Sequence, residues 1–275
     1  MSSARVKNTK SKRQVIHFLP IYGCIATGII YGAIGVIAIL SFLKVRHGGA
    51  DESSLLAILD EYIIGKIIIW LILLGTLCYV LWRFYEAITD PYDYGKQFKG
   101  LIKRIGIALS TVADILIVYA AVRVLLGTSH YQTDGKPREE QEMVQHMLRQ
   151  YGQWPVLTIG LVYAVTAIIQ LFYGITRGYR ERVDIERFPT YFQHIVHVLA
   201  WAGYFGRGII LGIIGFFFVK AGVVENARYV LNTDQAFDFI GDHVGHVYFI
   251  IVALATICYG LFMFAQGIAY DVDRD

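Results

Sequence analysis

Two ionisable residues lie inside long apolar runs of the sequence, where a charge is costly. Asp114 falls about ten residues into one run, near mid-membrane depth for a helix, and Arg207 falls about one turn into another. An unpaired carboxylate at that depth tends to keep its proton. Because ionisable groups within a bilayer often belong to ion or proton pathways, these two residues are candidates for ion pairing or proton transfer.

Thr27 and Ser110 join this pair when the apolar runs are aligned with one another. In that alignment Arg207 stands level with Thr27 and Ser110. Asp114 follows Ser110 by one helical turn, on the same face. If the runs surround a common axis, Arg207 reaches Asp114. Three interpretations stay open: a buried structural ion pair, a proton or ion site, and a contact of Asp114 with a partner subunit.

Other polar residues beside these runs predict no catalytic centre. Arg83 and Glu86 lie one turn apart at the cytoplasmic end of a run, and side chains that reach the lipid headgroups explain both. No nucleophile elbow, Walker loop, dinucleotide-binding glycine motif or zinc-protease motif occurs in the sequence. We therefore expect that the protein is not an enzyme.

Two histidine pairs have a spacing that can bind zinc, namely His194 with His197 and His243 with His246. No third or fourth ligand is evident by sequence for either pair, and a haem would need histidines within the core of facing runs. The three cysteines have no C-x-x-C spacing and are typical of small buried residues. The sequence thus predicts no metal and no cofactor.

The composition indicates that lipid is the main solvent of the chain. Of the 275 residues, 56% are hydrophobic and 17% are charged, whereas a soluble domain usually carries about 25% charge. The net charge of +3 gives no reason to expect a nucleic-acid partner, and anionic lipid explains the basic connections better.

Six apolar runs are each long enough for a helix to cross a bilayer core of about 30 Å. Backbone polar groups in lipid must bond internally, and these runs lack the alternation of barrel strands, so all six are predicted to be helices. They cover residues 20–43, 65–87, 104–126, 154–176, 203–222 and 245–269.

Lysine and arginine gather on one side of these runs. The segment before the first run and the second and fourth connections are basic, whereas the first, third and fifth connections are acidic. Because basic connections stay in the cytoplasm, we expect a multi-pass protein of the bacterial inner membrane with both termini cytoplasmic. Residues 1–19 are predicted to be a basic cytoplasmic tail.

The runs pair into three hairpins of related sequence. The first and fifth runs share the pattern G-x-x-x-x-G-I-I-x-G-x-I-G, the second and sixth share T-x-C-Y, and the middle hairpin is degenerate. The predicted fold is an all-α membrane protein of six transmembrane helices, built as three tandem hairpins around a pseudo-threefold axis. The hairpins cover 20–87, 104–176 and 203–270, with short amphipathic helices in their outer connections.

Glycines in the first and fifth runs have a spacing that favours close helix packing. Small residues at this spacing let helix backbones approach each other in lipid, where little hydrophobic force acts between helices. We expect packing inside the bundle, with a dimerisation face or a flexible gate as the alternative. The glycines are Gly28, Gly32, Gly35, Gly208, Gly212 and Gly215.

This pattern resembles the bacterial membrane family called domain of unknown function 1206, whose hairpins carry G-x-x-A-R-G-x-x-Y-x-x-x-G and then Y-x-x-W-R-x-x-x-A. The first hairpin matches at Gly23, Ala26, Gly28, Tyr31, Gly35, Tyr79, Trp82, Arg83 and Ala87. The third matches at Gly203, Gly206, Arg207, Gly208 and Gly215. Thr27 and Leu211 depart from the pattern, as does most of the second hairpin. The resemblance covers 20–270 and implies a six-helix fold, but no activity.

Three functions compete. We expect a structural or accessory subunit or scaffold of a membrane protein complex, whose partners are the lipid bilayer and other membrane proteins or further copies of the chain. The alternative is a channel or transporter for a small ion or solute, with Asp114 and Arg207 in the membrane interior. An enzyme or lipid-binding module built on the outer amphipathic segments is the third candidate.

Overall fold

The computed structural model of the chain describes residues 2–44, 49–90, 95, 97–127, 135–181, 183 and 185–269. Within these ranges, only the backbone is described for residues 2–17, 98–99, 102–103, 109–110, 112–114, 116–117, 120, 181 and 187.

The described residues form an all-helical fold. Its α-helices are α1 (Ser2–Phe42), α2 (Glu52–Asp60), α3 (Ile63–Thr89), α4 (Phe98–Leu125), α5 (Arg138–Tyr151), α6 (Trp154–Thr176), α7 (Thr190–Val224), α8 (Thr233–His243) and α9 (His246–Ile268). Three short 3-10 helices are η1 (Gly178–Glu181), η2 (Ile185–Arg187) and η3 (Ala227–Tyr229).

Five helices within the described residues are long and apolar enough to cross a membrane. They are the Phe18–Phe42 part of α1 together with α3, α6, α7 and α9. These five agree with five of the six predicted runs, and they indicate an integral membrane protein. The crossing of α4 stays a prediction.

Two of these helices are longer than the apolar runs that predicted them. α1 begins at Ser2, within the segment that was expected to be a separate tail, and α7 begins at Thr190. Lysine, arginine and glutamine are good helix formers, so the polar segment before the first run continues the same helix. In α7 the start follows Pro189, because proline favours the first positions of a helix.

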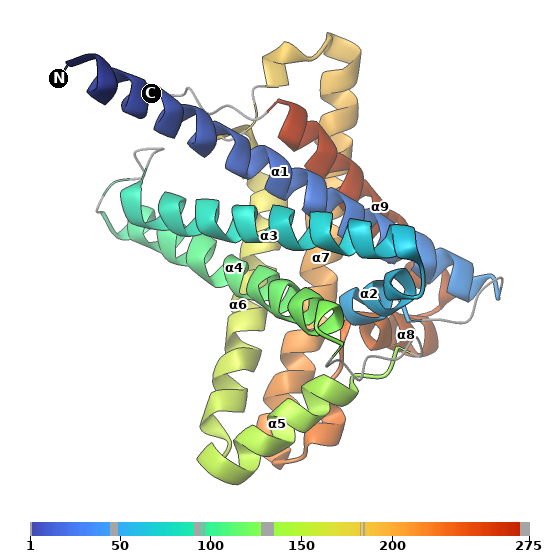
Figure 1. Cartoon of the computed structure of the whole chain (residues 1–275). Coiled ribbons are helices and arrows are strands. Elements are labelled where there is room, and N and C mark those ends of the chain that lie inside the picture. The colour runs from blue at the N-terminus through green and yellow to red at the C-terminus, as the bar shows by residue number, and fades with distance from the viewer. Residues whose placement is uncertain are drawn as a thin grey trace.

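The long helices pack in a closed circuit. Each contacts the next in the order α1, α3, α4, α6, α7 and α9, and α9 contacts α1 in turn. Figure 1 shows α6 and α7 side by side, running steeply across the direction of α3 and α4. Each hairpin therefore shares a face with both of the other hairpins.

The short helices α2, α5 and α8 lie at the same end of the circuit, with α2 and α8 close to each other and α5 lower in the view (Figure 1). We call them the lid helices and this end the lid end. The opposite end, where α1 begins and α9 ends, is the terminal end. Each lid helix buries apolar side chains against the long helices, including Leu56 of α2, Val144 of α5 and Phe237 of α8. Their positions agree with the short amphipathic segments that were predicted in the acidic connections.

Candidate functional site

Arg207 is buried in α7 and holds three helices together. Its side chain is 7% exposed, and one Nη donates a hydrogen bond to the hydroxyl of Tyr259 in α9. The guanidinium carbon lies 4.5 Å from the ring centre of Tyr31 in α1 and 4.9 Å from that of Tyr259. We call these three residues the arginine clamp.

The arginine clamp explains how a cation is tolerated in an apolar bundle. Two aromatic faces attract the guanidinium, and the hydroxyl of Tyr259 accepts a hydrogen bond from the charged group. Desolvation of the guanidinium is therefore offset by contacts from two neighbouring helices, which links the third hairpin to the first. Sequence reasoning singled out Arg207 but did not assign Tyr259 or Tyr31 to it.

The other residues of the predicted ion site are placed only in part. Thr27 is buried in α1, one turn before Tyr31. Asp114 and Ser110 lie outside the described side chains. The pairing of Arg207 with Asp114 therefore stays a prediction, whereas its contacts with Tyr31 and Tyr259 are present in the structure.

Aromatic rings continue from the arginine clamp to the terminal end. The ring of Tyr259 lies 5.6 Å from that of Tyr204, which stacks 6.2 Å from Tyr179 in η1. Tyr179 is 1% exposed, and its hydroxyl lies 2.8 Å from Nδ1 of His197. An arginine of η1, Arg180, lies 2.7 Å from Nε2 of the same imidazole. The connection between α6 and α7 thus buries the side chain of Tyr179 at the terminal end of the bundle.

One histidine of each predicted pair makes contacts within the protein. Both ring nitrogens of His197 are engaged, while His194 beside it is exposed. His243 stacks on the ring of Phe239 at 4.5 Å. No group of three histidine, cysteine or carboxylate side chains that could hold a metal occurs among the described residues.

Arg83 and Glu86 form an ion pair that the sequence interpretation placed at the headgroups. The Nη1 of Arg83 lies 3.7 Å from a carboxylate oxygen of Glu86, and its guanidinium lies over the ring of Tyr79. Glu86 is fully buried in protein, so the structure differs from that interpretation. The physical reason is that Arg83 and Tyr79 share its face of α3, and a buried carboxylate needs such a cationic neighbour.

The glycines of α1 and α7 lie where helix backbones meet. A Cβ at Gly28 would lie 3.0 Å from the carbonyl oxygen of Gly260 in α9, and one at Gly35 would lie 2.9 Å from that of Ala253. In α7, a Cβ at Gly215 would lie 2.8 Å from the backbone nitrogen of Ala164 in α6.

Three further glycines of the predicted set differ in the space beside them. Gly208 would bring a Cβ against the side chain of Leu171, whereas one at Gly212 would meet only Ala167, at 3.7 Å. A Cβ at Gly32 would meet nothing within 4 Å. Gly32 and Gly212 are therefore the two positions with room for a larger side chain.

Gly212 opens onto an apolar groove of about 470 Å³ between α6 and α7. Small residues of both helices, Ala164, Ala167, Gly208 and Gly212, line it. Ile168 and Phe216 are other lining residues, and they are 65% and 62% exposed. We call it the α6–α7 groove. Both helices that form it are apolar enough to cross a membrane.

At the lid end, the connections that lead into the three lid helices meet. The backbone N–H of Ala50, before α2, donates to a carboxylate oxygen of Asp234 in α8. The side-chain amide of Asn232 donates to the carbonyl oxygen of Gly135, before α5, at 3.0 Å. A Cβ at Gly135 would collide with Asp234 and Gly49, so the approach of these connections requires a glycine.

Carboxylates at the start of α2 and in α5 are gathered near this junction. Burial, with the nearby Glu52, raises the pKa of Asp51 to about 6, although a hydrogen bond from Ser54 opposes this. Burial also raises the pKa of Glu140 to about 7, and the charges of Asp51 and Glu52 contribute. One oxygen of Asp51 has no hydrogen-bond partner among the described residues. Sequence reasoning missed this group because its members are far apart in the chain.

Comparison with known proteins adds a family and one relative. The family model described as Domain of Unknown Function (DUF1206) matches residues 22–90 and 202–269, which are the first and third hairpins. The chain is 25% identical over 263 residues to "Uncharacterized protein YxxB" of Bacillus subtilis (strain 168), covering 94% of each chain. No solved structure matches the chain.

Proposed function

The first and third hairpins of this chain belong to the family Domain of Unknown Function (DUF1206), and from that premise we propose that the protein is a membrane-embedded accessory or scaffold subunit of a membrane protein complex, without catalysis of its own. The family name assigns no activity, so the proposal rests on the geometry of the chain itself. Its specific form is that a transmembrane helix of a partner protein packs into the α6–α7 groove.

The architecture that we propose has six crossings in three related hairpins around a pseudo-threefold axis, with α4 as the sixth crossing. α4 is 28 residues long and contacts both α3 and α6 within the circuit. The first and third hairpins also share one contact. Gly23 packs against Tyr79, and Gly203 and Tyr259, each 180 residues later in the chain, pack in the same way.

We further propose that the terminal end faces the cytoplasm of a bacterium and the lid end faces outward. The terminal end carries the basic connections, with Arg177 and Arg180 after α6 and Arg104 near the start of α4. The lid end carries acidic residues in all three connections. This distribution follows the positive-inside rule.

The α6–α7 groove is the observation that carries the proposed function. Most glycines of the repeated pattern are used for packing between helices of this chain, but a Cβ at Gly212 would meet only Ala167, at 3.7 Å, and Gly212 lines the groove. In lipid, helices associate where small residues of one surface admit the backbone of another. A groove floored by alanine and glycine from two adjacent helices offers that surface to a further helix.

The packing of Arg207 also favours a structural role over transport. Its guanidinium is fixed by Tyr259 and Tyr31, and these contacts tie the third hairpin to the first. The arginine clamp thereby contributes to the frame on which a partner helix can dock.

The experiment fills the groove and leaves a matched site alone. Gly212→Leu places an isobutyl group in the groove, whereas Gly32→Leu makes the same change in α1, where a Cβ also has free space. We expect the wild type and Gly32→Leu to be extracted from native membranes in a mild detergent with a second protein in fixed ratio. Gly212→Leu should be extracted without it, with unchanged helix content by circular dichroism. Recovery of the wild type as a lone chain, or equal retention by both variants, would contradict the proposal.

A further inference from the structure

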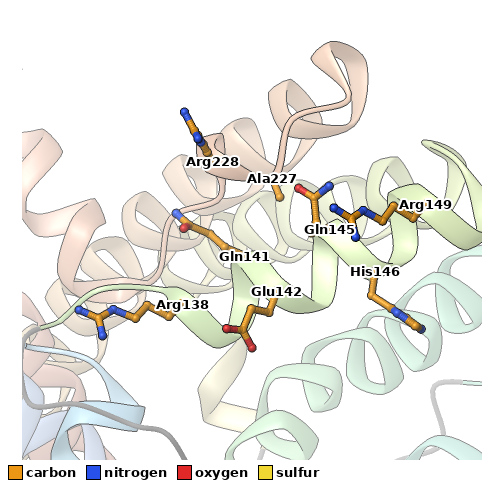
Figure 2. A pocket seen from close by; sticks show the side chains of 8 residues that line it. All are labelled: Arg138, Gln141, Glu142, Gln145, His146, Arg149, Ala227 and Arg228. Carbon is orange, nitrogen blue, oxygen red and sulfur yellow. The ribbon is translucent and has the colours of Figure 1, made fainter.

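A second groove, at the lid end, has the opposite chemistry. It has a volume of about 490 Å³ and lies between α5 and η3 (Figure 2). Three arginines line it, Arg138 and Arg149 from α5 and Arg228 from η3. Figure 2 shows Gln141 and Gln145 along α5 on the side that faces η3, with the head of Arg149 directed back toward Gln145. We call this the arginine groove.

Contacts on both sides hold the two walls of the arginine groove in place. α5 is anchored to the bundle by Val144, which is fully buried. The side-chain amide of Gln141 donates to the carbonyl oxygen of Val230, just after η3, at 3.4 Å. The side-chain oxygen of Asn226 accepts from the backbone N–H of Arg228 at 3.0 Å and starts η3. The groove is therefore present before any ligand arrives.

The charge of the arginine groove runs against its surroundings. Glu142 is the single carboxylate among its lining residues, against three guanidinium groups. Elsewhere the lid helices are acidic, with Asp51, Glu52 and Glu140 gathered at the junction. Positive charge at the acidic end is not explained by the rule that places basic residues at the other end. A local ligand that needs positive charge would explain it.

Arginine and amide side chains together point to a phosphate-bearing ligand. The planar guanidinium donates paired hydrogen bonds that fit phosphate oxygens, and it stays charged at every physiological pH. Gln145 adds a neutral donor, and Glu142 limits how much anionic charge the groove accepts. The backbone from Arg138 to Arg149 spans about 16 Å of helix, so the groove is long enough for an extended anion.

We propose that the arginine groove binds a phosphate-bearing anion. The phosphate has two sources that share this chemistry, the headgroup of an anionic phospholipid in the leaflet beside the lid helices and a soluble phosphate. This inference stands apart from the partner helix proposed above, because it uses different residues at a different depth.

The test measures binding to the purified full chain in an uncharged detergent. The probes are phosphatidylglycerol, phosphatidylcholine and inorganic pyrophosphate, each titrated and followed by native mass spectrometry. Arg149→Gln and Arg228→Gln each remove one exposed guanidinium, and Lys66→Gln removes an exposed cation at the start of α3, outside the groove but at the same end of the molecule. Glu142→Gln removes the opposing carboxylate.

We expect each groove arginine variant to bind the phosphate probe about tenfold more weakly, the size of one lost hydrogen bond to a charged group. Glu142→Gln should bind it more tightly, and Lys66→Gln should match the wild type. Binding of phosphatidylglycerol alone would assign the ligand to lipid, and binding of pyrophosphate as well would assign it to phosphate in general. Equal binding by all variants, or equal binding of phosphatidylcholine, would overturn the proposal.

Discussion

The arginine clamp can be dissected by removing a single oxygen. Tyr259→Phe deletes the hydroxyl that accepts from Arg207 but keeps the aromatic ring 4.9 Å from the guanidinium carbon. The variant therefore isolates the hydrogen bond from the attraction to the ring. A hydrogen bond to a charged group contributes about 1.5–3 kcal/mol, and the loss leaves a buried donor unsatisfied. We expect Tyr259→Phe to lower the free energy of unfolding by about 2 kcal/mol.

The same change in an Arg207→Met background should have little effect, since no guanidinium is then left without its acceptor. The coupling energy of the double-mutant cycle is the tested quantity, because exchanging a buried charge for an apolar residue is often neutral by itself. Unfolding in mixed micelles, followed by circular dichroism, measures all four proteins. Tyr248→Phe, on an exposed residue of α9, is the control and should change stability by less than about 0.5 kcal/mol. A coupling energy below about 0.5 kcal/mol would refute the assignment of Tyr259 as the partner of Arg207.

Three further predictions concern the lid, the helix contacts and a helix end. Burial raises the pKa values of Asp51 and Glu140 to about 6 and about 7 in the folded lid. Ionisation of these two carboxyl groups therefore lowers the stability of the lid as the pH rises from about 4 through 7. Amide exchange in α2 and α5, corrected for its intrinsic pH dependence, should therefore be slower at pH 5 than at pH 8. The double variant Asp51→Asn with Glu140→Gln should show a smaller difference in exchange rate between the two pH values. A wild type whose amides exchange faster at pH 5 than at pH 8 would contradict the predicted direction. Gly203→Leu should prevent folded protein from accumulating, because a side chain there meets the backbone of α9, and normal yield with wild-type stability would disprove that contact. Glu225→Gly should stabilise the end of α7 by up to about 1 kcal/mol in thermal unfolding, since Glu225 has φ +54°, and a loss of stability would contradict this.

Hydropathy predicted the helices well because lipid imposes a length on every crossing. Hydropathy did not predict the full length of α1 and α7, which extend beyond the apolar runs into polar sequence. The reason is that hydropathy detects only the part of a helix that is apolar enough for lipid. The short helices α2, α5 and α8 were predictable from their own periodicity. Their meeting at Gly135 was not, since no local pattern shows which connections approach each other.

The candidate site was predictable as a list of residue types but not as a set of contacts. Arg207 was conspicuous because charge is rare in an apolar run, yet its partners are tyrosines of α1 and α9 that sequence reasoning did not connect to it. Glu86 was read as a surface group because it lies near a helix end, and only the packing of α3 shows it buried. In both cases the missing information is which face of one helix meets which face of another.

The central claim, that a partner helix occupies the α6–α7 groove, is tested most directly by photo-crosslinking in native membranes. A photoreactive residue replaces Ile168 in the groove, or Leu71 on α3 as a control with a similarly exposed side chain. We predict one discrete adduct with another membrane protein at Ile168, no such adduct at Leu71, and loss of the adduct when Gly212→Leu is added. Adducts with lipid alone, with a second copy of this chain, or with the same protein at both positions would contradict the account.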